Sequence, residues 1–103
     1  MYLPQTFYNT DQIVRHSAGK THFFDADSKR FFRSRIGQNA YATANPFLTL
    51  FTTSEQFVDS QGHADPRLFS IRQYDSRNGN IDTMGKFQQY TSARQANRYA
   101  KHL

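Results

Sequence analysis

Cationic and aromatic side chains alternate in one short stretch of the sequence. The stretch reads Lys29-Arg30-Phe31-Phe32-Arg33-Ser34-Arg35. Phosphates require cations and unstacked bases stack on flat rings, so this mixture suits single-stranded DNA or RNA. In the alternative interpretation, the phenylalanines belong to the core and the arginines are solvated or paired with aspartates.

Further cations lie on a predicted hairpin and on a predicted C-terminal helix. On that helix they form a stripe that could follow a phosphate backbone, or a solvated face whose charges suit the helix dipole. The candidate residues for binding nucleic acid or another partner are Lys29, Arg30, Arg33, Arg35, Arg72, Arg77, Arg94, Arg98 and Lys101.

Two sets of acidic residues and histidines could hold a metal ion that activates water, as in a nuclease. The first set is His22, Asp25 and Asp27, and the second is His63 and Asp65, with Glu55 as the one glutamate. The aspartates of the first set also suit helix caps, and residues 63–66 are typical of a turn. Neither set has the spacing of a recognised metal site. We therefore expect a protein that is not an enzyme and has no cofactor.

The composition limits the possible classes of protein. At 103 residues the chain is expected to form one domain, residues 1–103. The absence of cysteine excludes disulfides, zinc ribbons and thiol catalysis. Ten Phe and six Tyr predict a core built from aromatic side chains. The net charge of +5 favours acidic partners, of which nucleic acid is the commonest, and nine of the thirteen cations are arginines.

Targeting signals are not apparent in the sequence. The first residues lack a basic region followed by an apolar run, so no signal peptide is expected. No apolar stretch approaches the length that spans a membrane. We expect a cytoplasmic protein that makes no membrane contact.

A β-hairpin over residues 67–84 is the strongest structural signal. Its first arm places Phe69 and Ile71 on one face, and Ser70, Arg72 and Tyr74 on the other. Asn78-Gly79 then supplies the positive φ angles that a tight turn requires. A second strand is predicted over residues 47–53, and the polar residues after it are typical of a strand that leaves the core.

Three segments favour helices. Residues 11–16 form a short helix with little apolar surface, and residues 25–36 fit a capped helix better than a strand. Ser92-Ala93-Arg94-Gln95 has the form of a capping box and begins the C-terminal helix. One face of that helix carries Ala93, Ala96, Ala100 and Leu103.

These elements predict an α+β fold. We expect a small antiparallel sheet of three to four strands, in which residues 47–53 lie beside the hairpin. The C-terminal helix should pack on one face of this sheet, and the shorter N-terminal elements should lie at an edge.

Several short motifs occur in a distinctive order. They are Phe23-Phe24, Arg30-Phe31-Phe32-Arg33-Ser34-Arg35, Thr53-Ser54-Glu55-Gln56-Phe57, Phe69-Ser70-Ile71-Arg72, Gly79-Asn80-Ile81-Asp82-Thr83 and Phe87-Gln88-Gln89-Tyr90. Over residues 23–100 the chain resembles a family of small uncharacterised proteins carried by phages, plasmids and their hosts. The resemblance implies an accessory gene of a mobile element, a class that includes anti-CRISPR and anti-restriction proteins, and it implies no site residue.

The sequence therefore favours a binding protein that engages nucleic acid or a nucleoprotein complex, RNA or DNA, in the host bacterial cell. Inhibition of a host defence is the more specific version, and it rests on the resemblance alone. Inhibitors that mimic DNA are acidic, so the positive charge disfavours mimicry. The alternatives are a protein–protein module that binds an acidic surface of a host protein or forms a homodimer, and a small metal-dependent nuclease.

Overall fold

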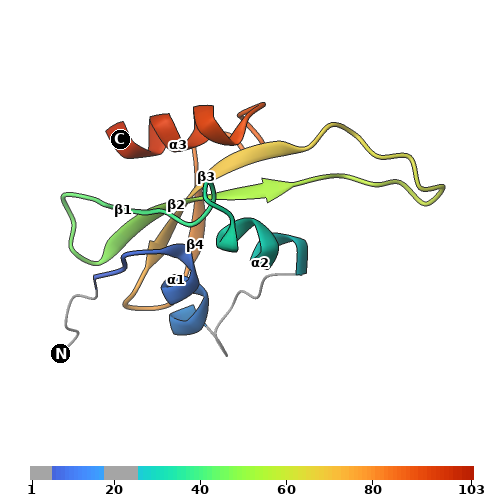
Figure 1. Cartoon of the computed structure of the whole chain (residues 1–103). Helices are drawn as coiled ribbons and strands as arrows, with labels where there is room; N and C mark the ends of the chain where they lie inside the picture. The colour runs from blue at the N-terminus through green and yellow to red at the C-terminus, as the bar shows by residue number, and fades with distance from the viewer. Residues whose placement is uncertain (1–5, 18–25) are drawn as a thin grey trace.

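The computed structural model describes residues 6–17 and 26–103. Within these ranges the elements are α1 (Thr10–Ser17), α2 (Ala26–Arg33), β1 (Ala40–Ala42), β2 (Leu48–Glu55), β3 (Leu68–Asp75), β4 (Ile81–Met84) and α3 (Ala93–His102). The strands form one antiparallel sheet in the order β1-β2-β3-β4 (Figure 1). The predicted α+β class, the small antiparallel sheet of three to four strands and the C-terminal helix on one of its faces are confirmed, and the sheet has four strands.

The predicted hairpin corresponds to β3 and β4. Its turn is closed by hydrogen bonds from Asp75 N to Asn80 O (2.9 Å) and from Gly79 N to Asp75 O (2.8 Å). Gly79 has a φ of 78°, whereas Asn78 does not have a positive φ. The turn therefore requires the left-handed conformation at one residue and not at two, and glycine occupies it at no steric cost.

Helix α3 packs on one face of the sheet. Ser92 caps the helix as expected, because its Oγ accepts a hydrogen bond from the Gln95 backbone N–H. Ala96 and Ala100 are buried, and Ala100 packs with Leu50 and Ile71 of the sheet. Their small side chains allow the helix backbone to lie close to the strands. The expectation that Leu103 shares this face was wrong, since it lies beyond the last helical turn and is 63% exposed.

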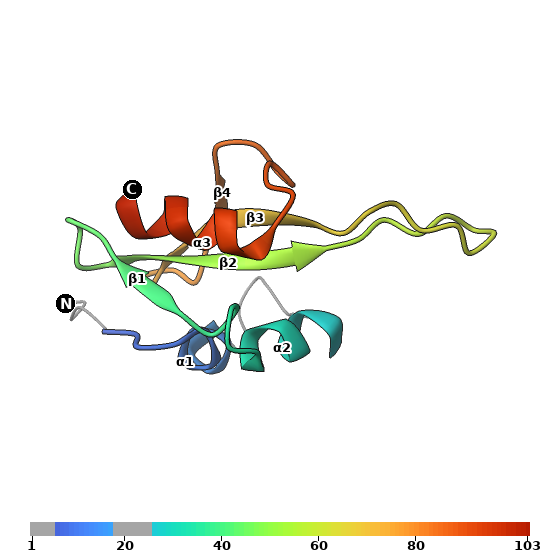
Figure 2. The same cartoon turned by 45° about the horizontal axis from the view of Figure 1, so that its top comes forward.

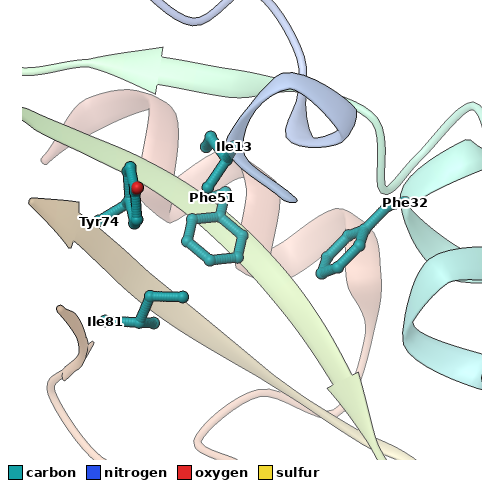
Figure 3. Close-up of a cluster of buried hydrophobic side chains, with 5 residues drawn as sticks. All are labelled: Ile13, Phe32, Phe51, Tyr74 and Ile81. Atoms are coloured by element: carbon teal, nitrogen blue, oxygen red, sulfur yellow. The ribbon is translucent and has the colours of Figure 1, made fainter. Parts of the chain in front are cut away.

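The opposite face of the sheet is covered by α1 and α2 (Figure 2). Five buried side chains form the core there: Ile13 of α1, Phe32 of α2, Phe51 of β2, Tyr74 of β3 and Ile81 of β4 (Figure 3). The expectation that the N-terminal elements lie at an edge was therefore wrong. Three strands present a large apolar side chain to this face, and the short helices cover these side chains, so the sheet is the middle of three layers.

The polar run at the end of β2 belongs to the sheet. Residues 52–54 are buried, and β2 continues past them, so the expected exit from the core was wrong. The Thr52 hydroxyl donates to Asn97 Oδ1 (3.3 Å), and Ser54 Oγ accepts from Arg67 Nη1 (2.8 Å). Buried hydroxyls are tolerated when each has a hydrogen-bond partner.

One buried side-chain amide connects α3 to the rest of the protein. Asn97 Oδ1 accepts hydrogen bonds from the Tyr41 hydroxyl (2.7 Å) and from Thr52. Its Nδ2 donates to the carbonyl oxygens of Ile36 and Ala93, both at 2.8 Å. Asn97 is 7% exposed, so water cannot readily replace these partners.

A second polar contact lies within the aromatic core. The Tyr74 hydroxyl and His16 Nδ1 share a hydrogen bond of 2.5 Å, and Phe7 contacts both rings edge-on. Burial is the main cause that raises the pKa of Tyr74, and the nearby carboxylate of Asp75 adds to it. The neutral phenol is therefore the form that the folded protein favours.

Replacement of Asn97 should loosen α3. We expect Asn97→Ala to lower the free energy of unfolding by about 2–3 kcal/mol, because it leaves buried polar groups without partners. Arg98→Ala, one residue along the same helix and exposed, is the control and should change stability by less than about 0.5 kcal/mol. Urea unfolding measures both; equal losses would contradict the role given to Asn97.

Alkaline pH should destabilise the protein through Tyr74. Because the pKa of Tyr74 is raised in the folded state, its hydroxyl loses its proton at a lower pH in the unfolded chain than in the folded protein. Its contribution to stability is therefore complete below about pH 10 and decreases as the pH rises through the folded-state pKa. Unfolding free energies measured from pH 7 to 11 should decrease less in Tyr74→Phe than in the wild type. An equal decrease in the wild type and in Tyr74→Phe would show that Tyr74 is not the cause of the alkaline loss of stability.

Candidate functional site

The nine predicted binding residues occupy three places in the fold. Four lie on α2 and the loop that follows it: Lys29, Arg30, Arg33 and Arg35. Three lie on α3: Arg94, Arg98 and Lys101. The remaining two, Arg72 and Arg77, belong to β3 and to the turn after it. Because α2 and α3 cover opposite faces of the sheet (Figures 1 and 2), most of the predicted residues lie on different sides of the protein, and only Arg35 and Arg94 line a common hollow.

The cations of α2 are exposed but lie close to acidic side chains. Arg30 forms an ion pair with Asp27 at 3.5 Å, and both side chains are largely exposed. On the neighbouring α1, Arg15 and Asp11 pair at 2.9 Å. Two shallow hollows between α1 and α2, of about 380 and 220 Å³, are both lined by Asp11 and Arg33. The α1–α2 layer thus mixes both signs of charge.

The aromatic side chains next to the α2 cations face the protein interior. Phe32 is 2% exposed and contacts Phe51, with ring centroids 5.9 Å apart. Phe31 is half-buried and contacts Phe69 at 5.8 Å. Of the two interpretations of this stretch, the structure supports the one in which the phenylalanines pack in the core: Phe32 is buried and Phe31 is packed against it with part of its surface exposed.

Helix α3 has a different outer surface. Its sequence contains no acidic residue, so none of its three cations is neutralised within the helix. Arg94, Arg98 and Lys101 follow one another at spacings of four and three residues, which places them on one side of the helix. Tyr99 is 51% exposed, and its ring stacks on Tyr90 at 5.5 Å. The sequence prediction missed this tyrosine, although its position directly after Arg98 could have indicated it.

A hollow of about 520 Å³ lies between the loop after α2 and the start of α3, and both Arg35 and Arg94 line it. Its lining is Ser34, Arg35, Ile36, Ser92, Ala93 and Arg94. One wall is the loop after α2, and the other is the first turn of α3. The amide of Asn97 donates to the carbonyl oxygens of Ile36 and Ala93, one on each wall. A single buried side chain therefore sets the distance between the two walls.

Arg72 lies in an internal polar network. Its guanidinium donates to Thr83 Oγ1 (2.8 Å) and Thr53 Oγ1 (3.3 Å), and it pairs with Glu55 at 3.4 Å. It also lies over the ring of Phe87, 5.1 Å from the centroid. The side chains of Arg72 and Glu55 are 22% and 20% exposed. These contacts give Arg72 a role in joining β2, β3 and β4.

Arg77 stabilises the hairpin turn. It donates to both carboxylate oxygens of Asp75, at 3.0 and 2.9 Å, and lies 4.9 Å from the centroid of the Phe47 ring. The hydrogen bond from Arg77 is the main cause that lowers the pKa of Asp75. Binding of a partner by Arg72 or Arg77 stays a prediction, and the structure gives both an internal role.

The structure describes only some of the acidic residues and histidines considered for a nuclease. His22 and Asp25 lie outside the described residues. His63 Nδ1 lies 3.2 Å from Asp59 Oδ2, and hydrogen bonds from the His63 backbone are the main cause that lowers the pKa of Asp59. Among residues 6–17 and 26–103, no three His, Asp or Glu side chains are grouped so that they could hold a metal ion.

A projecting arm is the main feature that the sequence prediction missed. The segment between β2 and β3, for which the sequence predicted a turn at residues 63–66, extends the β2–β3 pair beyond the body of the protein (Figures 1 and 2). Val58 and Ala64 form a bridge across it, and Asp65 N donates to Phe57 O (2.9 Å). At the tip, the Asp59 carboxylate accepts from the backbone N–H groups of residues 61 and 63.

Residues 9–101 match the model of a family of unknown function, DUF7447. The match covers most of the chain, so the protein belongs to this family, and the expected membership of an uncharacterised family is confirmed. Searches of the curated proteins and of the solved structures gave no match. In the described part of the chain, no helix has the length and apolar character needed to cross a membrane.

The internal role of Arg72 can be tested by comparing it with an exposed arginine. We expect Arg72→Ala to lower the free energy of unfolding by about 2 kcal/mol, because the partly buried Glu55 loses its counter-charge. Arg30→Ala removes an exposed ion pair and should cost less than about 0.5 kcal/mol. Chemical unfolding of the two variants measures the difference. A small loss in both would show that Arg72 is free to serve a partner.

Proposed function

We propose that this member of the family is a non-enzymatic protein that binds nucleic acid, or a nucleoprotein complex, through the outer surface of α3. The observation that carries the proposal is the stripe Arg94, Arg98 and Lys101 on a helix without acidic residues. Cations at this spacing can follow a phosphate backbone, and each displaces condensed counterions when it binds a phosphate.

The exposed ring of Tyr99 supports single strands as the target. It lies on the solvent side of α3 and is held by its stacking on Tyr90. Tyr99 lies about 100° round the helix from Arg98, so an unpaired base stacked on its ring would lie next to the stripe and not on it. The cations of α2 form a second, weaker electropositive region, because Asp27 and Asp11 lie among them.

The distribution of charge along the chain also supports the proposal. Residues 56–67, between β2 and β3, contain two acidic side chains, Asp59 and Asp65, against Arg67, a net charge of −1 with histidine neutral. Since the whole chain carries +5, the other residues carry +6. The body of the protein is thus more basic than the total suggests, which favours association with polyanions.

A more specific version of this function, inhibition of a host defence system, rests on the resemblance described above. A basic protein of a phage or plasmid that acts in the host cytoplasm could inhibit a defence system by occupying its bound RNA or DNA. Such an inhibitor would use the same surface of α3, and it should block the defence system without cleaving the nucleic acid. Degradation of the nucleic acid in the presence of Mg²⁺ would contradict the non-enzymatic part of the proposal.

Two double variants with the same loss of charge test the location of the site. We expect Arg98→Ala/Lys101→Ala to weaken binding of labelled single-stranded RNA and DNA at least tenfold at low salt. The dependence of log K on log [salt] should also become less steep by about 1.4, which is 0.7 for each lost single-strand contact. Fluorescence anisotropy measures both quantities.

Arg30→Ala/Arg33→Ala is the matched control on the opposite face and should have the smaller effect. Both double variants introduce alanine at exposed helical positions, and alanine has the highest helix propensity, so both helices should remain folded. A larger effect of the control would move the site to α2. Unchanged affinity in both doubles would contradict nucleic-acid binding through either helix.

A further inference from the structure

The arm between β2 and β3 presents an apolar ring beside a carboxylate. Phe57 is 62% exposed, and its carbonyl accepts the hydrogen bond from Asp65 N at 2.9 Å. Since Val58 and Ala64 are directly opposite each other, Phe57 and Asp65 are the next opposite pair. Side chains of residues directly opposite across an antiparallel pair lie on the same face. Phe57 and Asp65 are therefore neighbours on one face of the arm.

This face is held in place before any partner binds. Besides the bridge at Val58, the Gln56 side chain donates to the Asp65 carbonyl (3.0 Å), and Arg67 Nη2 donates to Gln56 Oε1 (3.3 Å). These hydrogen bonds cross the arm near its base, so little conformational entropy is lost on docking.

The hollow at the start of α3 has the complementary chemistry. Ile36 and Ala93 contribute apolar side chains to its lining, and Arg35 and Arg94 contribute exposed cations. Its volume of about 520 Å³ lies in the range of pockets that hold small ligands. The two walls are fixed to each other through Asn97, so the hollow is formed in advance.

We propose that the hollow receives the arm of a second copy of this chain, with Phe57 on Ile36 and Ala93, and Asp65 beside Arg35 and Arg94. Charge complementarity favours this occupant, because the arm, residues 56–67, carries a net charge of −1 in a protein whose total is +5, and its Asp65 lies beside Phe57. In both views the arm points away from the body, so a chain does not fill its own hollow (Figures 1 and 2). Each copy carries one arm and one hollow, and reciprocal docking closes a two-fold dimer.

Charge reversal in either the arm or the hollow should weaken the dimer. We expect the wild-type protein to give a concentration-dependent mass that reaches twice 12.0 kDa in light scattering and sedimentation velocity without nucleic acid. Asp65→Lys and the double variant Arg35→Asp/Arg94→Asp should each raise the dimer dissociation constant at least tenfold, because like charges then face each other. Phe57→Ser should have a similar effect through loss of the apolar contact.

Mixing the two charge-reversed proteins is the decisive step. In the mixture, the basic arm of the Asp65→Lys variant meets the acidic hollow of the double variant, while the unchanged acidic arm of the double variant meets a basic hollow. The heterodimer should therefore form although neither protein dimerises alone. Asp82→Lys and Lys86→Asp are the matched controls, since both positions are exposed and lie outside the arm and the hollow. They should dimerise like the wild type, and circular dichroism verifies that every variant is folded.

A wild type that stays monomeric at all concentrations would overturn this proposal. So would a dimer that survives both charge reversals, or a mixture of the two variants that remains monomeric. Arg94 belongs to both the stripe and the hollow, but the nucleic-acid test changes Arg98 and Lys101, and the dimer test contains no nucleic acid. The failure of one proposal can therefore be distinguished from the failure of the other.

Discussion

The position of α3 depends on the buried amide of Asn97, which forms hydrogen bonds to β1, to β2 and to the loop after α2. An amide can satisfy this site because it offers two donors and one acceptor oxygen with two lone pairs, and all of them have partners here. The apolar contact of α3 with the sheet is small, because it is made mainly by alanines. The polar contact therefore fixes the helix, and with it the cationic stripe and the hollow beside it.

Two pairs of arginines differ in their surroundings. Arg72 and Arg77 have acidic partners, aromatic rings and several hydrogen bonds, so their charge is neutralised within the fold. Arg94 and Arg98 lie on a helix that offers them no acidic neighbour. Counting cations in the sequence treats the two pairs alike, although the structure gives an acidic partner to each arginine of the first pair. The proposed function follows from this separation.

The sequence predicted what depends on local chemistry. The hairpin turn at Gly79, the cap at Ser92 and the alanine face of α3 each follow from a few neighbouring residues. The three-layer arrangement was not predicted, because it depends on Ile13 and Phe32 meeting a sheet face that is formed by strands distant in the sequence. The role of Asn97 was missed for the same reason. Its partners Tyr41 and Thr52 are more than forty positions away.

The polar end of β2 shows how a composition rule can mislead. Threonine and serine after an apolar strand usually mark its exit from the core, yet here their hydroxyls find partners and the strand continues. That continuation extends the sheet into the arm, which carries Phe57 and Asp65 out of the body. The same departure from the simple pattern thus produces a projecting arm that carries an exposed aromatic ring next to a carboxylate.

Binding of a polyanion by the unneutralised cations of α3 is the central claim, and the wild-type protein tests it most directly. Fluorescence anisotropy of labelled single-stranded RNA, single-stranded DNA and duplex DNA should be followed as protein is added, over a series of salt concentrations. We expect binding at low salt that weakens steeply as salt rises, with single strands preferred over the duplex because Tyr99 offers a stacking surface. Anisotropy that stays flat for all three probes at low salt would contradict the claim.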